Sequence, residues 1–203
     1  MPHKVKPPDL LVGDLDLVVW IGNKVLIGET KCFRRPATVH EWFQHEGRIR
    51  DAVQQLRRKV DYARTHPEWL AAQIREAGGA VDLACISVSG CVVLNSALGA
   101  LQVIDEVPIV DFTLLSRYFD PGHADFLGSK NPVRFDRVTF YGSQEEAAQN
   151  LEGYLCHPPH VGFYKTSIDW EERSQFDFAH PGRMVARIFP AVRLAGKEDI
   201  RLP

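Results

Sequence analysis

The chain has 203 residues, of which 45% are hydrophobic and 25% are charged, and its formal net charge at pH 7 is -2. This apolar content argues against a disordered chain, and the length predicts one domain, or one domain with an extension, around a real core. The small net charge is not that of a strongly basic nucleic-acid-binding protein.

Positive charge is concentrated in the first third of the chain. Residues 1–70 hold 12 Lys and Arg against 9 Asp and Glu, so this segment carries +3 and the remainder -5. We find no signal peptide and no long apolar span, so we expect a cytoplasmic protein with no membrane partner. Four cysteines without C-x-x-C spacing predict free thiols, and we expect Cys85 and Cys91 to be buried as small apolar residues.

Residues 13–31 predict a β-hairpin, because two apolar runs flank Gly22-Asn23, a dipeptide that favours a two-residue turn. Counting outwards from that turn, Asp16 lies opposite Glu29 and Asp14 lies opposite Lys31. Side chains alternate along a strand, so these four charged residues are expected on one face of the hairpin.

Two interpretations of this charged group are open. A cross-strand salt-bridge cluster on a solvated face is the common outcome for such residues. A divalent metal site is the other, because the neighbouring apolar runs predict strands covered on both faces, and charges there need a partner or a cation. Carboxylates at this spacing suit Mg²⁺, which takes one or two of them and keeps several waters.

The hairpin also resembles a known family. Asp16, twelve intervening residues and then Glu29-Thr30-Lys31 are similar to the D…(D/E)-x-K signature of the PD-(D/E)xK, or restriction-endonuclease-like, nuclease superfamily. The surrounding residues resemble its Mrr-like and Holliday-junction-resolvase-like members, and the likeness covers about residues 10–115. The family's core usually begins with a helix and a strand for which this sequence leaves no room. The chain is therefore either a piece of a longer protein or completes its sheet otherwise.

The resemblance implies a role for each matching residue. Asp16 and Glu29 would hold Mg²⁺ (or Mn²⁺) with the backbone carbonyl of Thr30, and Lys31 would orient or deprotonate the attacking water and stabilise charge on the phosphate. Asp14 would be an accessory residue, which either contacts a metal ligand or replaces one. The implied chemistry is metal-assisted hydrolysis of a phosphodiester bond.

A long helix is predicted from a capping box at Thr38 and Glu41 to about Arg64, with one apolar stripe. Gln55 lies on this helix, and related nucleases often place a glutamine near the site, so it is a second accessory residue. The basic residues of this helix and of the connection before it belong either to a solvated surface or to a phosphate-contacting face. As candidate nucleic-acid-binding residues we take Arg34, Arg35, Arg48, Arg57, Arg58 and Lys59.

The following segments predict alternating helices and strands. We expect a helix from Pro67 to Gly78-Gly79, strands over 81–88 and 91–95 joined by a turn at Ser89-Gly90, a strand over 106–112 and a helix over 113–119. With the hairpin, this order predicts an α/β fold: a restriction-endonuclease-like mixed β-sheet flanked by helices.

From Asp120 onwards the sequence predicts a C-terminal α+β extension, with residues 1–119 as the nuclease-like core and 120–203 of unknown role. We expect a loop to about Pro132, a strand over 133–141, a helix from Ser143 to about Cys156, and strands over 161–169 and 184–192.

Two functions of different class remain open. The first is a divalent-metal-dependent nuclease that hydrolyses DNA. The second is a catalytically inactive nuclease-like domain that binds nucleic acid or serves assembly. A metal-dependent hydrolase of small phosphate esters is a more distant third. DNA is the expected partner, and cutting both strands of a duplex usually needs two sites, so we expect a homodimer or a place in a longer protein or complex.

Overall fold

The structure is a computed structural model that describes residues 6–9, 12–130, 133–161, 168–171 and 191–194. The chain divides into two compact units, with the boundary between Pro158 and Pro159. All candidate site residues lie in the first unit. The second unit contains a two-stranded antiparallel sheet of β8 (Ile168–Glu171) and β9 (Ala191–Leu194).

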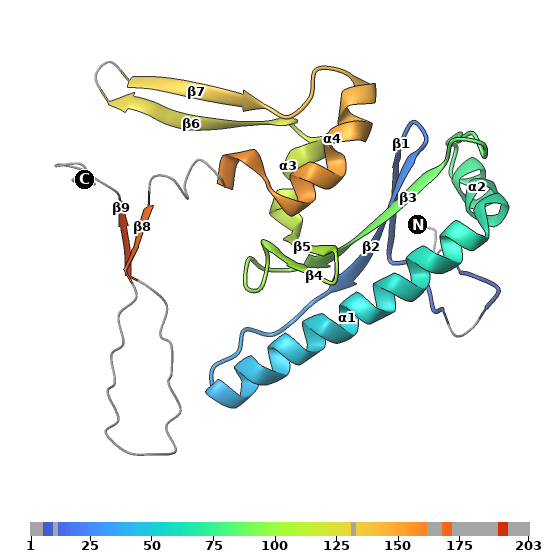
Figure 1. Cartoon of the computed structure of the whole chain (residues 1–203), viewed down its shortest axis with the longest axis horizontal. Coiled ribbons are helices and arrows are strands. Elements are labelled where there is room, and N and C mark those ends of the chain that lie inside the picture. Colours follow the sequence, from blue (N-terminus) through green and yellow to red (C-terminus); the bar gives the residue numbers. More distant parts are fainter. Residues whose placement is uncertain (1–5, 10–11, 131–132, 162–167, 172–190, 195–203) are drawn as a thin grey trace. The chain divides into compact units, whose positions relative to one another are not determined.

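The first unit is built on a mixed sheet of five strands in the order β1-β2-β3-β5-β4 (Figure 1). The strands are β1 (Leu17–Ile21), β2 (Lys24–Lys31), β3 (Ser87–Leu94), β4 (Gln102–Ile104) and β5 (Val107–Asp111). The central strands β2, β3 and β5 run parallel, and each edge strand is antiparallel to its neighbour. The α/β class and the mixed sheet flanked by helices are therefore confirmed.

The β1–β2 hairpin has the predicted register. Leu17 pairs with Gly28 and Ile21 pairs with Lys24 across the turn. Gly22 has a φ of +56°, which glycine adopts without steric cost. The β1–β2 ladder ends at Leu17, so Asp16 and Asp14 lie outside it, on either side of an isolated bridge residue, Leu15.

The helix α1 (Val39–Thr65) covers one face of the sheet, where it packs on β2 and β3. Its predicted capping box is present: Glu41 N–H donates to Thr38 Oγ1, and the Glu41 carboxylate accepts from the N–H groups of Ala37 and Thr38, which lowers the pKa of Glu41. The helix α2 (Pro67–Glu76) follows directly and begins with Pro67, as predicted. Among the described residues, no helix is long and apolar enough to cross a membrane.

The apolar core between α1 and the sheet contains alternate residues of β2 and β3, which face the helix. Its members include Val25, Ile27, Ile49, Val53, Leu56, Val60, Val88, Val92 and Leu94. Leu26, Cys91 and Val93 have the opposite orientation and are also buried. Both faces of the central strands are therefore covered.

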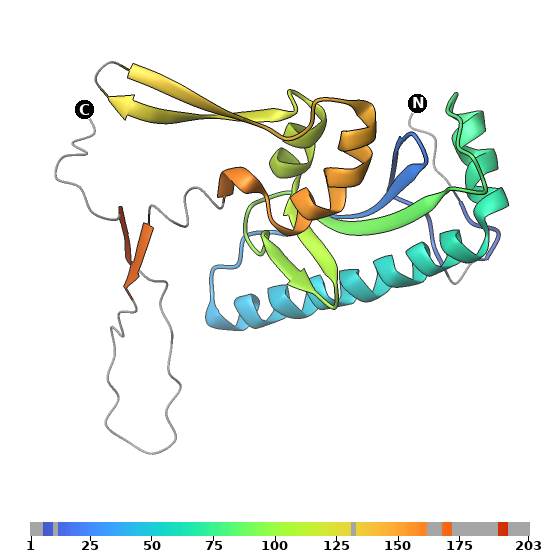
Figure 2. The same cartoon turned by 45° about the horizontal axis from the view of Figure 1, so that its top comes forward.

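The opposite face is covered by α3 (Phe112–Phe119) and α4 (Gln144–Cys156), as Figures 1 and 2 show. Two tyrosines join these helices: Tyr118 Oη donates to Ala147 O at 2.6 Å, and Tyr154 Oη donates to Leu114 O at 3.0 Å. Ser143 caps α4 by accepting from Glu146 N–H, as predicted. The sheet is thus the middle layer between α1 and the α3–α4 pair.

The predicted strand–turn–strand over 81–95 is wrong. Residues 83–85 form a turn, and β3 is a single strand that passes through Ser89 and Gly90. Gly90 serves close packing rather than a turn, because a Cβ there would lie 2.7 Å from Val60 Cγ2 and 3.1 Å from Leu56 Cδ1. The expectation for Cys91 is confirmed, whereas Cys85 lies in the turn and is exposed.

The segment after Asp120 also differs from the prediction. The expected loop contains a strand, β6 (His123–Lys130), which pairs with β7 (Val133–Thr139). Both strands precede the boundary at Pro158, so the compact unit extends beyond residue 119, the expected end of the nuclease-like core. Of the strands expected over 161–169 and 184–192, residues 162–167 and 184–190 lie outside the described residues.

Two glycines provide a matched test of how closely α1 packs on β3. We expect Gly90→Ala to lower the free energy of unfolding by about 1–3 kcal/mol, because the new methyl group overpacks the interface with Val60 and Leu56. Gly47→Ala, in the exposed part of α1 where a Cβ meets nothing within 4 Å, should raise it by about 1 kcal/mol. Urea unfolding followed by circular dichroism measures both, and a neutral Gly90→Ala would contradict this packing.

The cysteines give a second test. Burial raises the pKa of Cys91 to about 12, so very little reactive thiolate is present at about pH 8. We expect iodoacetamide to modify the exposed Cys32 and Cys85 in the native protein and to spare Cys91 until urea unfolds it. Peptide mass spectrometry identifies the modified residues, and labelling of native Cys91 at the rate of Cys32 would refute the assigned burial.

Candidate functional site

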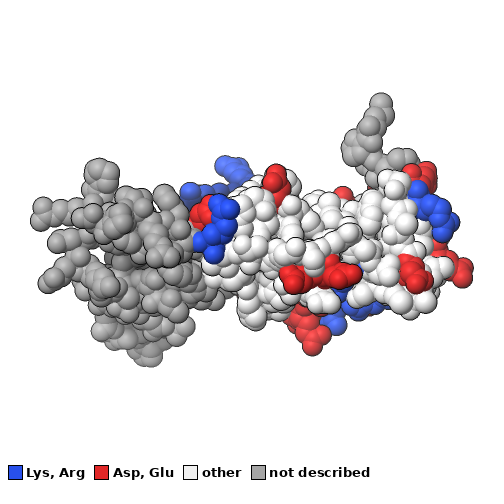
Figure 3. All heavy atoms as spheres, turned by 90° about the horizontal axis from the view of Figure 1, so that it is seen from above, with Lys and Arg blue, Asp and Glu red and all other residues white. Residues whose placement is uncertain are grey.

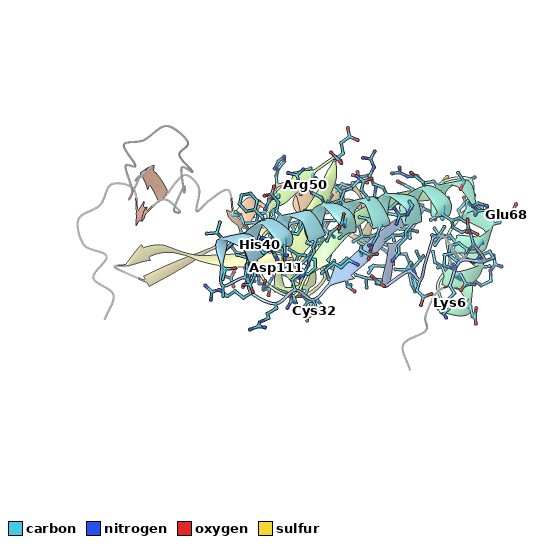
Figure 4. All side chains as sticks on the ribbon, turned by 90° about the horizontal axis from the view of Figure 1, so that it is seen from below. Lys6, Cys32, His40, Arg50, Glu68 and Asp111 are labelled. Atoms are coloured by element: carbon cyan, nitrogen blue, oxygen red, sulfur yellow. The ribbon has the colours of Figure 1, made fainter. Side chains whose placement is uncertain are left out.

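The candidate site lies where the carboxyl end of β2 passes beneath the middle of α1. Three segments contribute to it: the bend before β1 with Asp16, the end of β2 with Glu29 and Lys31, and the turn of α1 that carries Gln55 and Lys59. In Figure 4, Cys32, which follows Lys31, lies on the opposite side of α1 from Arg50. The site is therefore on the β1–β2 side of the helix.

Glu29 is the buried centre of this group. Only 2% of the residue is exposed. Its Oε1 lies 2.6 Å from Lys31 Nζ, and its Oε2 accepts from Lys59 Nζ. Alternation along β2 places Glu29 on the same face as Val25 and Ile27, towards α1, so its charge must be neutralised locally.

Asp16 joins the group from the other side. Its Oδ2 accepts from Thr30 N–H at 3.0 Å and lies 3.7 Å from Lys59 Nζ. About 31% of the Asp16 side chain is exposed, so this side of the group is open to solvent. Asp16 and Glu29 thus share Lys59, and Lys31 pairs with Glu29, whereas Asp16 contacts β2 only through a backbone hydrogen bond outside the ladder.

Lys31 is held by two acceptors. Its Nζ donates to Gln55 Oε1 at 2.7 Å in addition to its contact with Glu29. A quarter of the Lys31 side chain is exposed, so its ammonium group is fixed in direction and remains reachable. The structure thus brings Gln55 to the site, whereas Asp14 lies outside the β1–β2 ladder, before Asp16.

Lys59 differs from its predicted role. We expected it on the surface as a nucleic-acid-binding residue, but only 5% of it is exposed and its ammonium group lies between Glu29 and Asp16. The reason is helical geometry, because Lys59 lies four residues after Gln55 and adjoins Leu56 and Val60 on the buried side of α1. That i, i+4 spacing from Gln55 was the sequence signal for its position.

The basic residues predicted to bind nucleic acid do not share one face. Arg48 precedes Gln55 by seven residues, so it lies on the same side of α1 as the site. Arg57 instead lies 3.6 Å from Asp105, in the β4–β5 turn at the other edge of the sheet. Arg34, Arg35 and Arg58 are exposed, the first two in the connection that follows Lys31. Figure 3 shows the side of the protein that carries α3 and α4, where the Lys and Arg side chains of the described residues form no continuous patch.

Asn95 was missed by the sequence analysis. Its backbone N–H donates to Lys31 O at 3.1 Å, its Oδ1 accepts from Phe33 N–H at 3.0 Å and its Nδ2 donates to Phe33 O at 3.2 Å. It thereby holds the chain that leaves Lys31 to the end of β3. The signal was a polar residue directly after a buried strand.

The charges of the group balance. Asp16 and Glu29 provide two negative charges, and Lys31 and Lys59 provide two positive charges. Since a buried carboxylate without a counter-charge is strongly unfavourable, the two lysines neutralise this group without any bound ion. Of the two interpretations open from the sequence, the salt-bridge cluster describes these contacts. Its expected position on a solvated face is wrong, because Glu29 and Lys59 are buried.

The same residues fit a divalent cation. Lys59 Nζ is a positive centre shared by both carboxylates, so the two side chains already converge on one cationic position. Together with the Thr30 carbonyl, Asp16 and Glu29 would supply oxygen donors only, and Mg²⁺ accepts such donors when waters complete its coordination. In the part of the chain that the structure describes, no group of three or more His, Cys, Asp or Glu residues is placed to hold a metal.

Comparison of the chain with protein families, with curated proteins and with solved structures finds no match. Functional inference therefore depends on the geometry of the site itself.

The Glu29–Lys59 pair makes a testable contribution to stability. We expect Glu29→Gln to lower the free energy of unfolding by about 3 kcal/mol, because it leaves the buried Lys59 ammonium without its main counter-charge. The double variant Glu29→Gln with Lys59→Met should recover most of that loss, since neither charge is then buried alone. Urea unfolding of the two single variants and the double variant gives the coupling.

Glu46→Gln is the matched control for this cycle. Glu46 pairs with Arg50 at 2.8 Å on the exposed side of α1, so its loss should change stability by less than about 1 kcal/mol. Additive effects of Glu29→Gln and Lys59→Met would mean that the two side chains do not interact in solution.

Proposed function

We propose that this protein is a nuclease of the PD-(D/E)xK type, which hydrolyses DNA phosphodiester bonds with Mg²⁺ or Mn²⁺. The observation that carries the proposal is the convergence of Asp16, Glu29 and Lys31 at the carboxyl end of β2. In open α/β sheets, binding sites commonly lie at the carboxyl ends of the parallel strands. A restriction-endonuclease-like fold is part of the proposal, and the five-stranded mixed sheet with helices on both faces is compatible with it.

Asp16, Glu29 and the Thr30 carbonyl would hold the cation. When bound, the cation supplies positive charge to a phosphate oxygen and lowers the pKa of a coordinated water. Glu29 is suited to a fixed ligand because burial in the sheet and the packing of α1 restrict its side chain. Asp16 is kept in place by its hydrogen bond from Thr30 N–H and faces the solvent side.

Lys31 would act on the phosphate and on the attacking water. Its ammonium group is held by Gln55 Oε1 and Glu29 Oε1, so it is already directed when substrate arrives. A fixed positive charge stabilises the negative charge that develops on phosphate oxygens, because no reorganisation is needed during the reaction. Gln55 is a positioning residue in this scheme, since it contacts Lys31 rather than the reacting atoms.

DNA is the proposed substrate because three exposed arginines lie near the site in the chain or on its side of α1. Arg34 and Arg35 lie three and four residues after Lys31, and Arg48 lies on the site side of α1. Such residues bind phosphate groups without reading sequence, and their contribution weakens as salt rises. A second copy of the chain would supply the second site that cutting of both strands requires.

One observation favours a second function. Both oxygens of Glu29 are engaged by lysine ammonium groups, and the cluster is balanced in charge without any ligand. A catalytically inactive nuclease-like module that binds nucleic acid or serves assembly would keep this network for stability alone. The two functions differ in whether divalent metal changes the behaviour of the protein towards DNA.

Supercoiled plasmid and linear duplex incubated with Mg²⁺, Mn²⁺ or EDTA separate the two. We expect metal-dependent nicking by the native protein, and a rate at least about 100-fold lower for Lys31→Ala, because a preorganised charge at the phosphate is lost. Lys24→Ala is the matched control, since Lys24 is at the opposite end of the same strand and pairs with Glu152. Circular dichroism verifies that each variant is folded.

Retarded migration of DNA without cutting, under every metal condition, would favour the inactive module. Equal nicking by the native protein and Lys31→Ala would contradict the assigned site.

A further inference from the structure

We propose that Lys59 is an internal counter-ion that occupies the cation position between Asp16 and Glu29, and that a divalent metal must displace it to bind. This inference deepens the proposed function and rests on its metal site. Lys59 thereby sets the metal affinity of the site, in addition to stabilising the metal-free fold.

The first argument is one of space. Lys59 Nζ donates to Glu29 Oε2 and lies 3.7 Å from Asp16 Oδ2, so it stands where a cation shared by the two carboxylates would be. Mg²⁺ binds oxygen ligands at about 2.0–2.1 Å and keeps an octahedral shell. An ammonium group and a hydrated metal ion cannot occupy this position together.

The second argument is one of charge. Asp16 and Glu29 are neutralised by Lys31 and Lys59 when no metal is present. A divalent cation added to that set would give a net charge of +2 at a position that includes a residue only 2% exposed. Withdrawal of the Lys59 ammonium group lowers this excess of positive charge. Lys31 is expected to stay in place, because Gln55 also holds its ammonium group.

The third argument concerns the path of the displaced group. The Glu29 side chain is 3% exposed and is closed beneath α1, but the Asp16 side chain is 31% exposed. The four-carbon stem of lysine is flexible, so the ammonium group can turn past Asp16 towards solvent while the stem stays packed. A phosphate that approaches from that side would meet the displaced charge.

The test is the affinity for Mn²⁺, measured from the paramagnetic resonance signal of the free ion, without DNA or turnover. We expect Lys59→Met to bind Mn²⁺ at least about tenfold more tightly than the native protein, because the competing cation is gone. Arg75→Met removes a positive charge from an exposed residue of α2 and should leave the affinity unchanged. The double variant Glu29→Gln with Lys59→Met should lose this binding, which assigns it to the site.

Lys59→Arg is a second variant, which keeps the charge and the ion pair if Lys59→Met does not fold. A guanidinium group holds a carboxylate through two hydrogen bonds, so we expect weaker Mn²⁺ binding than in the native protein. Differential scanning fluorimetry with Mg²⁺ gives an independent readout, in which Lys59→Met should show a larger metal-induced rise in Tm than the native protein.

The outcomes are distinguishable. Mn²⁺ affinity that is the same in the native protein, Lys59→Met and Lys59→Arg would overturn the displacement of Lys59 while leaving the metal site intact. Absence of Mn²⁺ binding to the native protein and to every folded Lys59 variant would overturn the metal site, and with it the proposed nuclease.

Discussion

Burying the carboxylate of Glu29 beneath α1 carries a large electrostatic cost, and the surrounding structure offsets it. The residue is on a central strand whose preceding helix-facing residues, Val25 and Ile27, are apolar, and only 2% of it is exposed. Two lysines from different elements satisfy its two oxygens, and Gln55 fixes one of those lysines. Hairpin and helix are thus joined by charge as well as by apolar packing. Removal of Glu29 or Lys59 leaves the other buried charge without its main partner.

The apolar packing determines where the charges can meet. Gly90 lets α1 approach β3 so closely that a methyl group would collide with Val60. Lys59 is adjacent to Val60 on the helix, so the same approach brings its ammonium group within reach of β2. At the other end of the site, Asn95 ties the chain after Lys31 to the end of β3. The site therefore depends on residues that never touch it, and its geometry is a property of the whole α1–β2–β3 layer.

Local signals in the sequence were sufficient for the hairpin and the first helix. The turn at Gly22 set the register, and the capping box at Thr38 set the start of α1, because both depend on neighbouring residues alone. The single strand β3 was not predicted, since Gly90 has the same local signature in a turn and in a tightly packed strand. The burial of Lys59 depends on a contact with Glu29, thirty residues away in the chain. Lysine side chains are usually exposed, so the residue type alone predicted a surface position for Lys59.

A balanced ion-pair network and a metal site require much the same residues, and this explains why both interpretations fit the geometry. A purely structural network gains little stability from an exposed member, because solvent screening weakens an ion pair there. Asp16 is such a member, with 31% of its side chain exposed and its carboxylate directed by Thr30 N–H. Lys31 is likewise held in direction while remaining reachable. Preorganised charges at an open edge stabilise a fold little and bind a ligand well, so the direction of Asp16 and Lys31 favours a site that acts on something outside the chain.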